Sequence, residues 1–101
     1  MPGTLAMLVM RVLRNGPLHG YAIAQRIHQL SSDELQVEEG SLYPALQRLR
    51  QRGEVTAAWG QTPNNQRARY YSITRAGRRQ LGLEEAGFAE ILTAIQRIMY
   101  A

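Results

Sequence analysis

The sequence predicts one small domain that is mainly α-helical, contains a single β-hairpin and ends in a long helix. Three stretches of helical apolar periodicity come first, and two short segments rich in aromatic and β-branched residues follow them. A last helical stretch carries large apolar residues at nearly heptad spacing. The 101 residues suit one domain, and the absence of cysteine excludes disulfide scaffolds and thiolate metal sites.

The first helix is expected over residues 4–14. Thr4 can cap it, and apolar residues then recur at a helical period, with methionines at the remaining positions. A helix that is apolar nearly all round is usually buried on more than one side. Residues 15–17, an Asn-Gly-Pro segment, favour a stop after it.

A second helix is expected from residue 19 or 20 to residue 30. Its inner face would hold Ile23, Ile27 and Leu30, and polar residues would end it. The acidic stretch 33–39 that follows contains two apolar residues in alternation, which allows one short strand there.

A third helix is expected over residues 41–52. Ser41 is a good N-cap. Pro44 is tolerated only in the first turn, where the backbone N–H lacks a partner, so Pro44 would fix where this helix starts. Gly53 would end it. The spacing of the apolar residues gives the inward stripe: Leu42, Ala45, Leu46 and Leu49.

Residues 54–60 and 68–74 are expected to form the two strands of a hairpin. Apolar residues alternate in the first segment, and aromatic and β-branched residues fill the second. The loop between them is polar and cationic. A last helix begins at Thr74 or Arg75. The apolar seam of this helix consists of Phe88, Ile91, Leu92, Ile95, Ile98 and Met99.

The basic residues are concentrated in the middle of the chain. All twelve are arginine, and the formal net charge is +4. Residues 40–83 hold eight arginines and one acidic residue, a net charge of +7, and the rest of the chain is −3. A basic segment inside a near-neutral chain suggests a nucleic-acid face. The preference for arginine over lysine has an alternative origin in the composition of the source genome.

The order of three helices, a basic hairpin and a long helix is the layout of a winged helix-turn-helix. In this layout the third helix enters the major groove, and the wing contacts the neighbouring backbone or minor groove. With the apolar stripe inward, the third helix would turn six residues outward: Ser41, Tyr43, Pro44, Gln47, Arg48 and Gln51.

Each outward residue of the third helix offers a contact to DNA. Glutamine can read adenine and arginine can read guanine, each through two hydrogen bonds. Ser41 and the free N–H groups at the helix start can hold a phosphate. Tyr43 can contact a phosphate, a sugar or a base. The alternative for Tyr43 is half-buried packing against the second helix, and the alternative for Arg48 is a solvated charge.

The wing supplies five further candidates for DNA contact: Asn64, Asn65, Gln66, Arg67 and Arg69. They follow the predicted reading helix directly, and each phosphate contact would add salt-dependent affinity. The alternative is a flexible hydrophilic loop, which the composition alone does not reject.

Three motifs together resemble the PadR family of bacterial transcriptional regulators. They are GPLHGYAI at residues 16–23, GSLYPALQRL at 40–49 and RYYSITRAG at 69–77. The resemblance spans about residues 4–81, and it implies a homodimeric winged-helix DNA-binding protein, usually a repressor. It also implies the residues on the DNA side: Ser41, Tyr43, Pro44 and Arg48.

The same resemblance implies how two copies would pair, because in this family the C-terminal helix packs against the partner's N-terminal region. The short length resembles the subfamily with a single C-terminal helix. We therefore expect a DNA-binding domain of residues 1–74 and a dimerisation helix of residues 75–101. The apolar seam and the apolar first helix agree with this independently. The expected interface residues are Leu5, Leu8, Phe88, Ile91, Leu92, Ile95, Ile98 and Met99.

The chain departs from the family pattern at some positions. Ala22 stands where the second-helix motif often has an acidic residue, and arginine stands where lysine is common. Some short members bind flat aromatic drugs between tryptophans near the dimer centre. The single Trp59 falls on the expected hairpin, so a drug site is not supported here. An apolar effector pocket between protomers stays open, because the last helix carries Phe88, Met99 and Tyr100.

Enzymes and metal proteins are disfavoured. His19 and His28 are nine residues apart, and no credible nucleophile, general base or metal set accompanies them. We expect His19 to cap or pack, His28 to lie at the surface, and the protein to use no cofactor and no metal. No apolar run reaches the length of a membrane span, so a cytoplasmic protein is expected.

The function expected from the sequence is that of a homodimeric repressor that binds a pseudo-palindromic promoter site on double-stranded DNA. The sequence leaves open whether a small effector acting on the dimer releases it. The alternative is a winged-helix module that binds another protein, because a fold does not fix a function.

Overall fold

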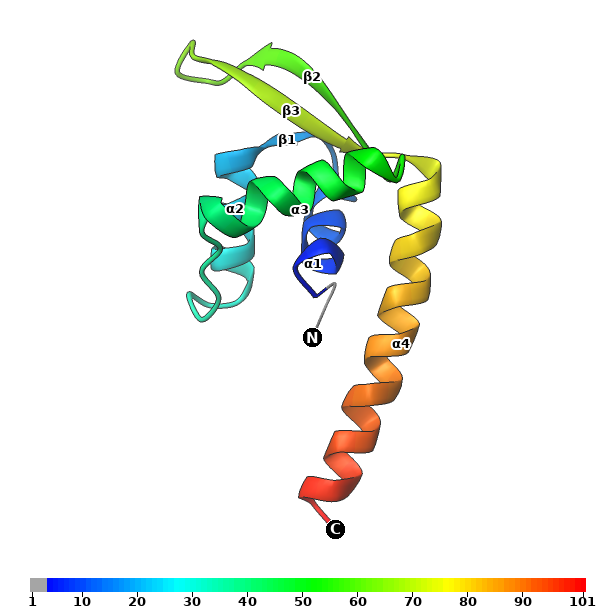
Figure 1. Ribbon diagram of the computed structural model, residues 1–101. Helices are drawn as coiled ribbons and strands as arrows, with labels where there is room; N and C mark the ends of the chain where they lie inside the picture. The colour runs from blue at the N-terminus through cyan, green and yellow to red at the C-terminus, as the bar shows by residue number, and fades with distance from the viewer. Residues whose placement is uncertain (1–3) are drawn as a thin grey trace.

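The computed structural model describes residues 4–101 (Figure 1). Within these residues, the helices and the hairpin follow one another in the predicted order, with one additional short strand. The elements are α1 (Thr4–Leu13), β1 (Leu18–His19), α2 (Gly20–Leu30), α3 (Glu39–Gln51), β2 (Val55–Gln61), β3 (Arg67–Ile73) and α4 (Arg75–Met99). The three strands pair antiparallel in the order β1-β3-β2. The predicted winged helix-turn-helix is confirmed.

The core lies between α1, α2, α3 and the inner face of the sheet. Arg11 is the one exposed residue of α1, which confirms that this helix is buried on more than one side. The predicted inward stripe of α3 is also confirmed, since its four side chains are each at most 1% exposed: Leu42, Ala45, Leu46 and Leu49. Replacing a leucine packed in this way by alanine typically costs about 2–5 kcal/mol, so this stripe fixes how α3 is held.

The inner face of α2 is shorter than predicted. Ile23 and Ile27 are buried, but Leu30 is 60% exposed, so its assignment to the inner face is wrong. The reason is that α2 ends at Leu30 and the chain turns away at once. Ser32 and Asp33 take positive φ angles of 54° and 67°, which carry the backbone out of the helix.

The strand that the sequence allowed within residues 33–39 is also wrong. The alternating residues Leu35 and Val37 belong to an irregular connection that is tied to α2 and not to the sheet. The N–H of Leu35 donates to Ser31 Oγ at 2.9 Å, and its carbonyl oxygen lies 3.1 Å from His28 Nδ1. The third strand is instead β1, which pairs with β3 and has only two residues.

The start of α3 differs from the prediction by two residues. Glu38 precedes the helix without a side-chain cap, and the N–H of Leu42 already donates to the Glu38 carbonyl at 2.9 Å. Ser41 is therefore inside the helix and is not its cap, and Pro44 lies in the second turn and not in the first. Proline has no N–H for the carbonyl of Gly40, four residues back. Both residues are exposed, so water can satisfy that carbonyl.

The wing is a hairpin with a continuous register. Val55 pairs with Ile73 at its base, and Gln61 pairs with Arg67 at its outer end. The strands extend one residue further toward the tip than predicted, which shortens the loop to residues 62–66. Because residues alternate between the two faces of a strand, this register decides which side chains share a face.

The tip of the wing is closed by its own hydrogen bonds. The N–H of Thr62 donates to the Gln66 carbonyl at 2.8 Å, and Asn65 adopts a left-handed conformation with φ of 61°. On one face of the hairpin the ring of Tyr70 lies directly against Gly60, where a Cβ would be only 3.0 Å from it. The aromatic ring thus covers a position that has no side chain of its own.

The last helix, α4, is anchored at its beginning and free at its end. Thr74 Oγ1 accepts from the N–H of Gly77 at 3.0 Å and donates to the Gly53 carbonyl at 2.7 Å. Gly77 and Leu81 are buried, whereas every residue from 88 to 101 is exposed. Figure 1 shows this second half of α4 projecting away from the rest of the molecule.

Candidate nucleic-acid interface

The outward face of α3 is a continuous exposed surface. All six residues predicted to face outward are exposed: Ser41, Tyr43, Pro44, Gln47, Arg48 and Gln51. Gln47 and Gln51 also border a shallow depression of about 390 Å³ beside β2, together with Val55 and Ala57. The polar face of α3 therefore lies next to the base of the wing.

Tyr43 lies at the junction of α3 and α2. Its side chain is 46% exposed, and its ring packs over Gly20, where a Cβ would be 2.8 Å from the phenolic oxygen. Burial raises the pKa of Tyr43 above its ordinary value, and the nearby Glu39 carboxylate adds to this. The phenol therefore stays protonated at neutral pH and can donate a hydrogen bond. Tyr43 therefore combines the half-buried packing considered from the sequence with partial exposure on the candidate DNA face.

The beginning of α3 is less suited to a phosphate than the sequence suggested. The helix starts at Glu39, and the N–H of Ser41 is already bonded to the Glu38 carbonyl at 3.0 Å. The carboxylates of Glu38 and Glu39 stand at this end and would repel a phosphate group. The exposed hydroxyl of Ser41 is what this segment still offers to DNA.

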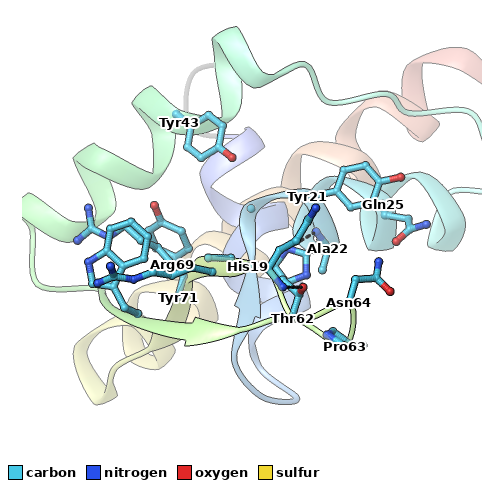
Figure 2. Close-up of a pocket in the computed structure, with 15 residues that line it drawn as sticks. His19, Tyr21, Ala22, Gln25, Tyr43, Thr62, Pro63, Asn64, Arg69 and Tyr71 are labelled. Carbon is cyan, nitrogen blue, oxygen red and sulfur yellow. Dashed lines mark hydrogen bonds between the residues drawn. The ribbon is translucent and has the colours of Figure 1, made fainter.

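A groove of about 790 Å³ lies between the wing and the start of α2, with Tyr43 at its α3 side. Figure 2 shows Tyr21 and Gln25 of α2 and Asn64 of the wing tip around this opening. Tyr21 is 69% exposed. Sequence reasoning missed Tyr21 and Gln25, because a helical period marks which residues are buried but not which exposed residues face a neighbouring element.

The predicted wing residues divide between the tip and the strand. Asn64, Asn65 and Gln66 are exposed at the tip, Arg67 is exposed at the start of β3, and Arg69 is half-buried further along that strand. Four of these five line the groove: Asn64, Gln66, Arg67 and Arg69. The structure thus brings most of the wing candidates to the same opening as Tyr43.

Trp59 of β2 is a third residue of the groove that the sequence did not predict, after Tyr21 and Gln25. Its indole is 60% exposed and lines the groove. The guanidinium carbons of Arg67 and Arg69 lie 4.5 Å and 5.6 Å from the ring centroid. A large exposed aromatic residue in a strand next to a basic strand was a usable signal, but the alternation pattern had assigned Trp59 to the apolar side.

The two histidines have structural contacts. His19 precedes α2 and its Nδ1 accepts from the N–H of Ala22 at 3.4 Å, as predicted for a cap. His28 is half-buried and not fully at the surface, with Nε2 3.3 Å from Asp33 Oδ1. Among residues 4–101, no group of three or more potential metal ligands lies together, and no helix has the length and hydropathy of a membrane span.

The residues predicted for a dimer interface fall in two places. Leu5 and Leu8 of α1 are half-buried and border a depression of about 430 Å³ beside the α2–α3 connection. The six residues of the α4 seam are between 40% and 76% exposed: Phe88, Ile91, Leu92, Ile95, Ile98 and Met99. Water therefore contacts a row of large apolar side chains in the isolated chain.

The sequence matches the model of the "Transcriptional regulator PadR-like family" over residues 9–83. An uncharacterized 37.1 kDa protein in a transposon of Streptomyces fradiae is 40% identical over 85 residues. That match covers 84% of this chain and 23% of the Streptomyces protein, so the chain corresponds to a minor part of that relative.

Solved structures show the same fold. A transcriptional regulator from Clostridium thermocellum superposes with a TM-score of 0.85 at 23% identity, covering 94% of this chain and 92% of the other. A PadR family transcriptional regulator from Eggerthella lenta reaches a TM-score of 0.78 at 30% identity, covering 96% and 82%. With the family match extending over most of the winged-helix fold, the chain is a DNA-binding transcriptional regulator of the PadR-like family.

Proposed function

We propose that this protein is a site-specific DNA-binding repressor that reads DNA with α3 and grips the flanking backbone with its wing. The observation that carries the proposal is the exposed face of α3, which borders the groove at Tyr43 and the base of the wing at Gln47 and Gln51. Gln47, Arg48 and Gln51 offer hydrogen bonds suited to base edges. The arginines of the wing offer charge to phosphates beside them.

We propose further that the working unit is a homodimer paired through residues 75–101, with residues 1–74 as the reading domain. The exposed apolar seam of α4 supports this, because an isolated soluble chain rarely keeps such a row of large side chains in water. Two reading helices would then enter successive major grooves about 34 Å apart and bind a pseudo-palindromic promoter site. Occupancy of that site would block transcription.

A small apolar effector fits this arrangement as a regulator. Phe88 and Met99 stand in the seam and are 40% and 69% exposed, so the side chain of either is accessible to a ligand held between protomers. Such a ligand would act by changing the spacing of the two reading domains, and only to the extent that it binds one spacing better than the other.

The function is tested by titrating salt against binding to labelled DNA from the protein's own upstream region, with a scrambled duplex of equal length as control. We expect tight binding to the upstream DNA alone, with an affinity that falls steeply as salt rises. Equal weak binding to both duplexes, together with no preferred sequence in a random-duplex selection, would contradict the proposal and favour a protein partner.

Arg48→Ala tests the reading helix. If Arg48 reads a base, the variant should lose about 1–3 kcal/mol of discrimination between the specific and the scrambled duplex. Arg97→Ala is the matched control, since Arg97 is an exposed arginine near the end of α4 and should leave both affinities unchanged. Equal weakening of Arg48→Ala on both duplexes would reassign Arg48 to a phosphate contact.

A further inference from the structure

Trp59 and two arginines form a stacked cluster on the wing. Trp59 is the only tryptophan of the chain, and its side chain is 60% exposed. The guanidinium carbons of Arg67 and Arg69 lie 4.5 Å and 5.6 Å from the centroid of the indole ring. Both distances fall within the range of about 6 Å at which a cation is attracted to an aromatic face.

The register of the hairpin explains why these three side chains meet. Trp59 pairs directly with Arg69 across the ladder, and Arg67 lies two residues from Arg69 on the same face of β3. Val55 and Tyr71 belong to this face too, and they are buried against the helices. The wing extends past the helices, so the same face continues outward uncovered and lines the groove.

Stacking leaves the guanidinium groups able to bind an anion. An arginine lying on a ring is attracted through its face, and its N–H donors point outward in the plane of the group. The Nε of Arg69 is buried without a hydrogen-bond partner, so its terminal nitrogens are the donors offered to an anion. No carboxylate within residues 4–101 forms an ion pair with Arg67 or Arg69. Their charge is therefore available to an external anion, and an arginine already held in place loses less side-chain freedom when it binds.

We propose that Trp59 is a positioning residue of the wing. Its indole holds the guanidinium groups of Arg67 and Arg69 over the groove, where they meet the phosphates of one DNA strand. This proposal rests on the proposed DNA-binding function and adds to it a residue that acts on DNA through two others. It predicts that the contribution of Trp59 depends on the presence of these arginines.

The first test compares substitutions of Trp59 in binding to the upstream duplex. Trp59→Ala should weaken binding by about 5- to 30-fold, because the guanidinium groups of Arg67 and Arg69 must then be ordered when DNA binds. Trp59→Phe keeps an aromatic face and should recover most of that loss. Leu30→Ala is the matched control, because Leu30 is also 60% exposed but lies at the far end of α2. Thermal unfolding should show that all three variants remain folded at the temperature of the binding assay.

The deciding test is a double-mutant cycle. In the background Arg67→Ala with Arg69→Ala, adding Trp59→Ala should weaken binding by less than about two-fold, because the groups it positions are gone. A loss as large as in the wild-type background would overturn the proposal, since the indole would then contact DNA by itself. A wild-type affinity for Trp59→Ala would overturn it as well.

The failure of this proposal is distinguishable from failure of the proposed function. If wild-type protein binds the upstream duplex specifically and Trp59→Ala binds equally well, only the positioning role is wrong. If wild-type protein shows no specific binding, the proposed function itself is wrong. Fluorescence of the single tryptophan gives an independent readout, since DNA bound in the groove should change the emission of Trp59.

Discussion

Gly20 and Tyr43 show how a missing side chain places a functional one. The phenol of Tyr43 occupies the space that a Cβ at position 20 would need, with 2.8 Å between that Cβ and the phenolic oxygen. The ring is thereby held between α2 and α3, and Tyr43 is still 46% exposed. Glycine at the first position of a helix costs little stability. The close packing of Tyr43 therefore explains the glycine at position 20 better than a requirement of the backbone conformation does.

The raised pKa of Glu84 makes the free energy of unfolding depend on pH. Partial burial raises its pKa above the ordinary 4.5, and the Glu54 carboxylate raises it further, against smaller opposing effects of Gln80 and Arg52. A raised pKa in the folded state means that the folded protein binds the proton more tightly than the unfolded chain does. This contribution to stability is complete below pH 4.5 and is lost as the pH rises through the folded pKa.

Glu84→Gln should therefore be more stable than wild type at neutral pH. Because the carboxyl is only partly buried, we expect a gain below about 1 kcal/mol. The gain should disappear near pH 4, where the wild-type carboxyl is protonated. Urea unfolding at both pH values measures this difference. Glu90→Gln, at an exposed position of the same helix, is the control, and an equal gain in that variant would refute the explanation.

At the scale of elements, the sequence predicted the features that leave a regular spacing of apolar residues. The helices and the inward stripe of α3 were predicted because regular burial leaves a regular pattern. The start of α3 was not, because a backbone hydrogen bond from Leu42 to Glu38 begins it, without the side-chain cap that Ser41 suggested. Strand β1 has two residues, which is too few for any alternation to appear.

The spacing of apolar residues also predicted one part of the candidate site, the exposed face of α3. Once Leu42 and its neighbours are placed inward, the exposed face of α3 follows from geometry. The contribution of α2 did not follow, since Tyr21 reaches the groove through tertiary packing. For Trp59, alternation gave the correct face of the strand. That face is exposed because the hairpin is longer than the helices beneath it, and no local pattern encodes this.

The contact between α4 and the base of the wing depends on a glycine. A Cβ at Gly77 would overlap the carbonyl oxygen of Glu54 and would come within 2.8 Å of Ile73 Cγ1. The same carbonyl accepts a hydrogen bond from the N–H of Thr74 at 3.0 Å. The backbone of α4 at Gly77 therefore packs directly on the backbone of Glu54. This contact sets the direction in which α4 leaves the domain.

Gly77→Ala should be destabilising, because a carbonyl oxygen on the opposing backbone has little room to move. Overpacking of this kind typically costs about 1–3 kcal/mol. Gly82→Ala is the matched control in the same helix, where a Cβ would meet nothing within 4 Å. It should stabilise the protein by about 0.5–1 kcal/mol through helix propensity alone. Chemical denaturation of the two variants beside wild type checks both signs.

At the scale of the whole molecule, α4 begins against the folded domain and ends in solvent. Its 25 residues span about 37 Å, of which only the first turns contact the domain. The apolar residues beyond Phe88 repeat on one side of the helix and remain exposed. Isolated helices are marginally stable in water. In the proposed dimer, the partner would stabilise the second half of α4.

Ile95→Asp should convert the proposed dimer into a monomer. A carboxylate in the middle of an apolar seam would lose its hydration without gaining a partner. Light scattering or sedimentation gives the molecular mass directly. Thr93→Asp introduces the same charge on the opposite side of α4 and should leave the mass unchanged. A dimeric Ile95→Asp variant would show that the seam is not the interface.

The projecting half of α4 also has a consequence for how the regulator responds to its own abundance. If residues 88–99 are covered only by a second copy, burial of this apolar surface stabilises both the folded helix and the dimer. The free energy of unfolding then depends on protein concentration. Well below the dissociation constant, the amount of dimer varies with the square of the total protein. A two-fold fall in synthesis would then remove about three-quarters of the DNA-binding species, so dilution at cell growth would itself act as a signal.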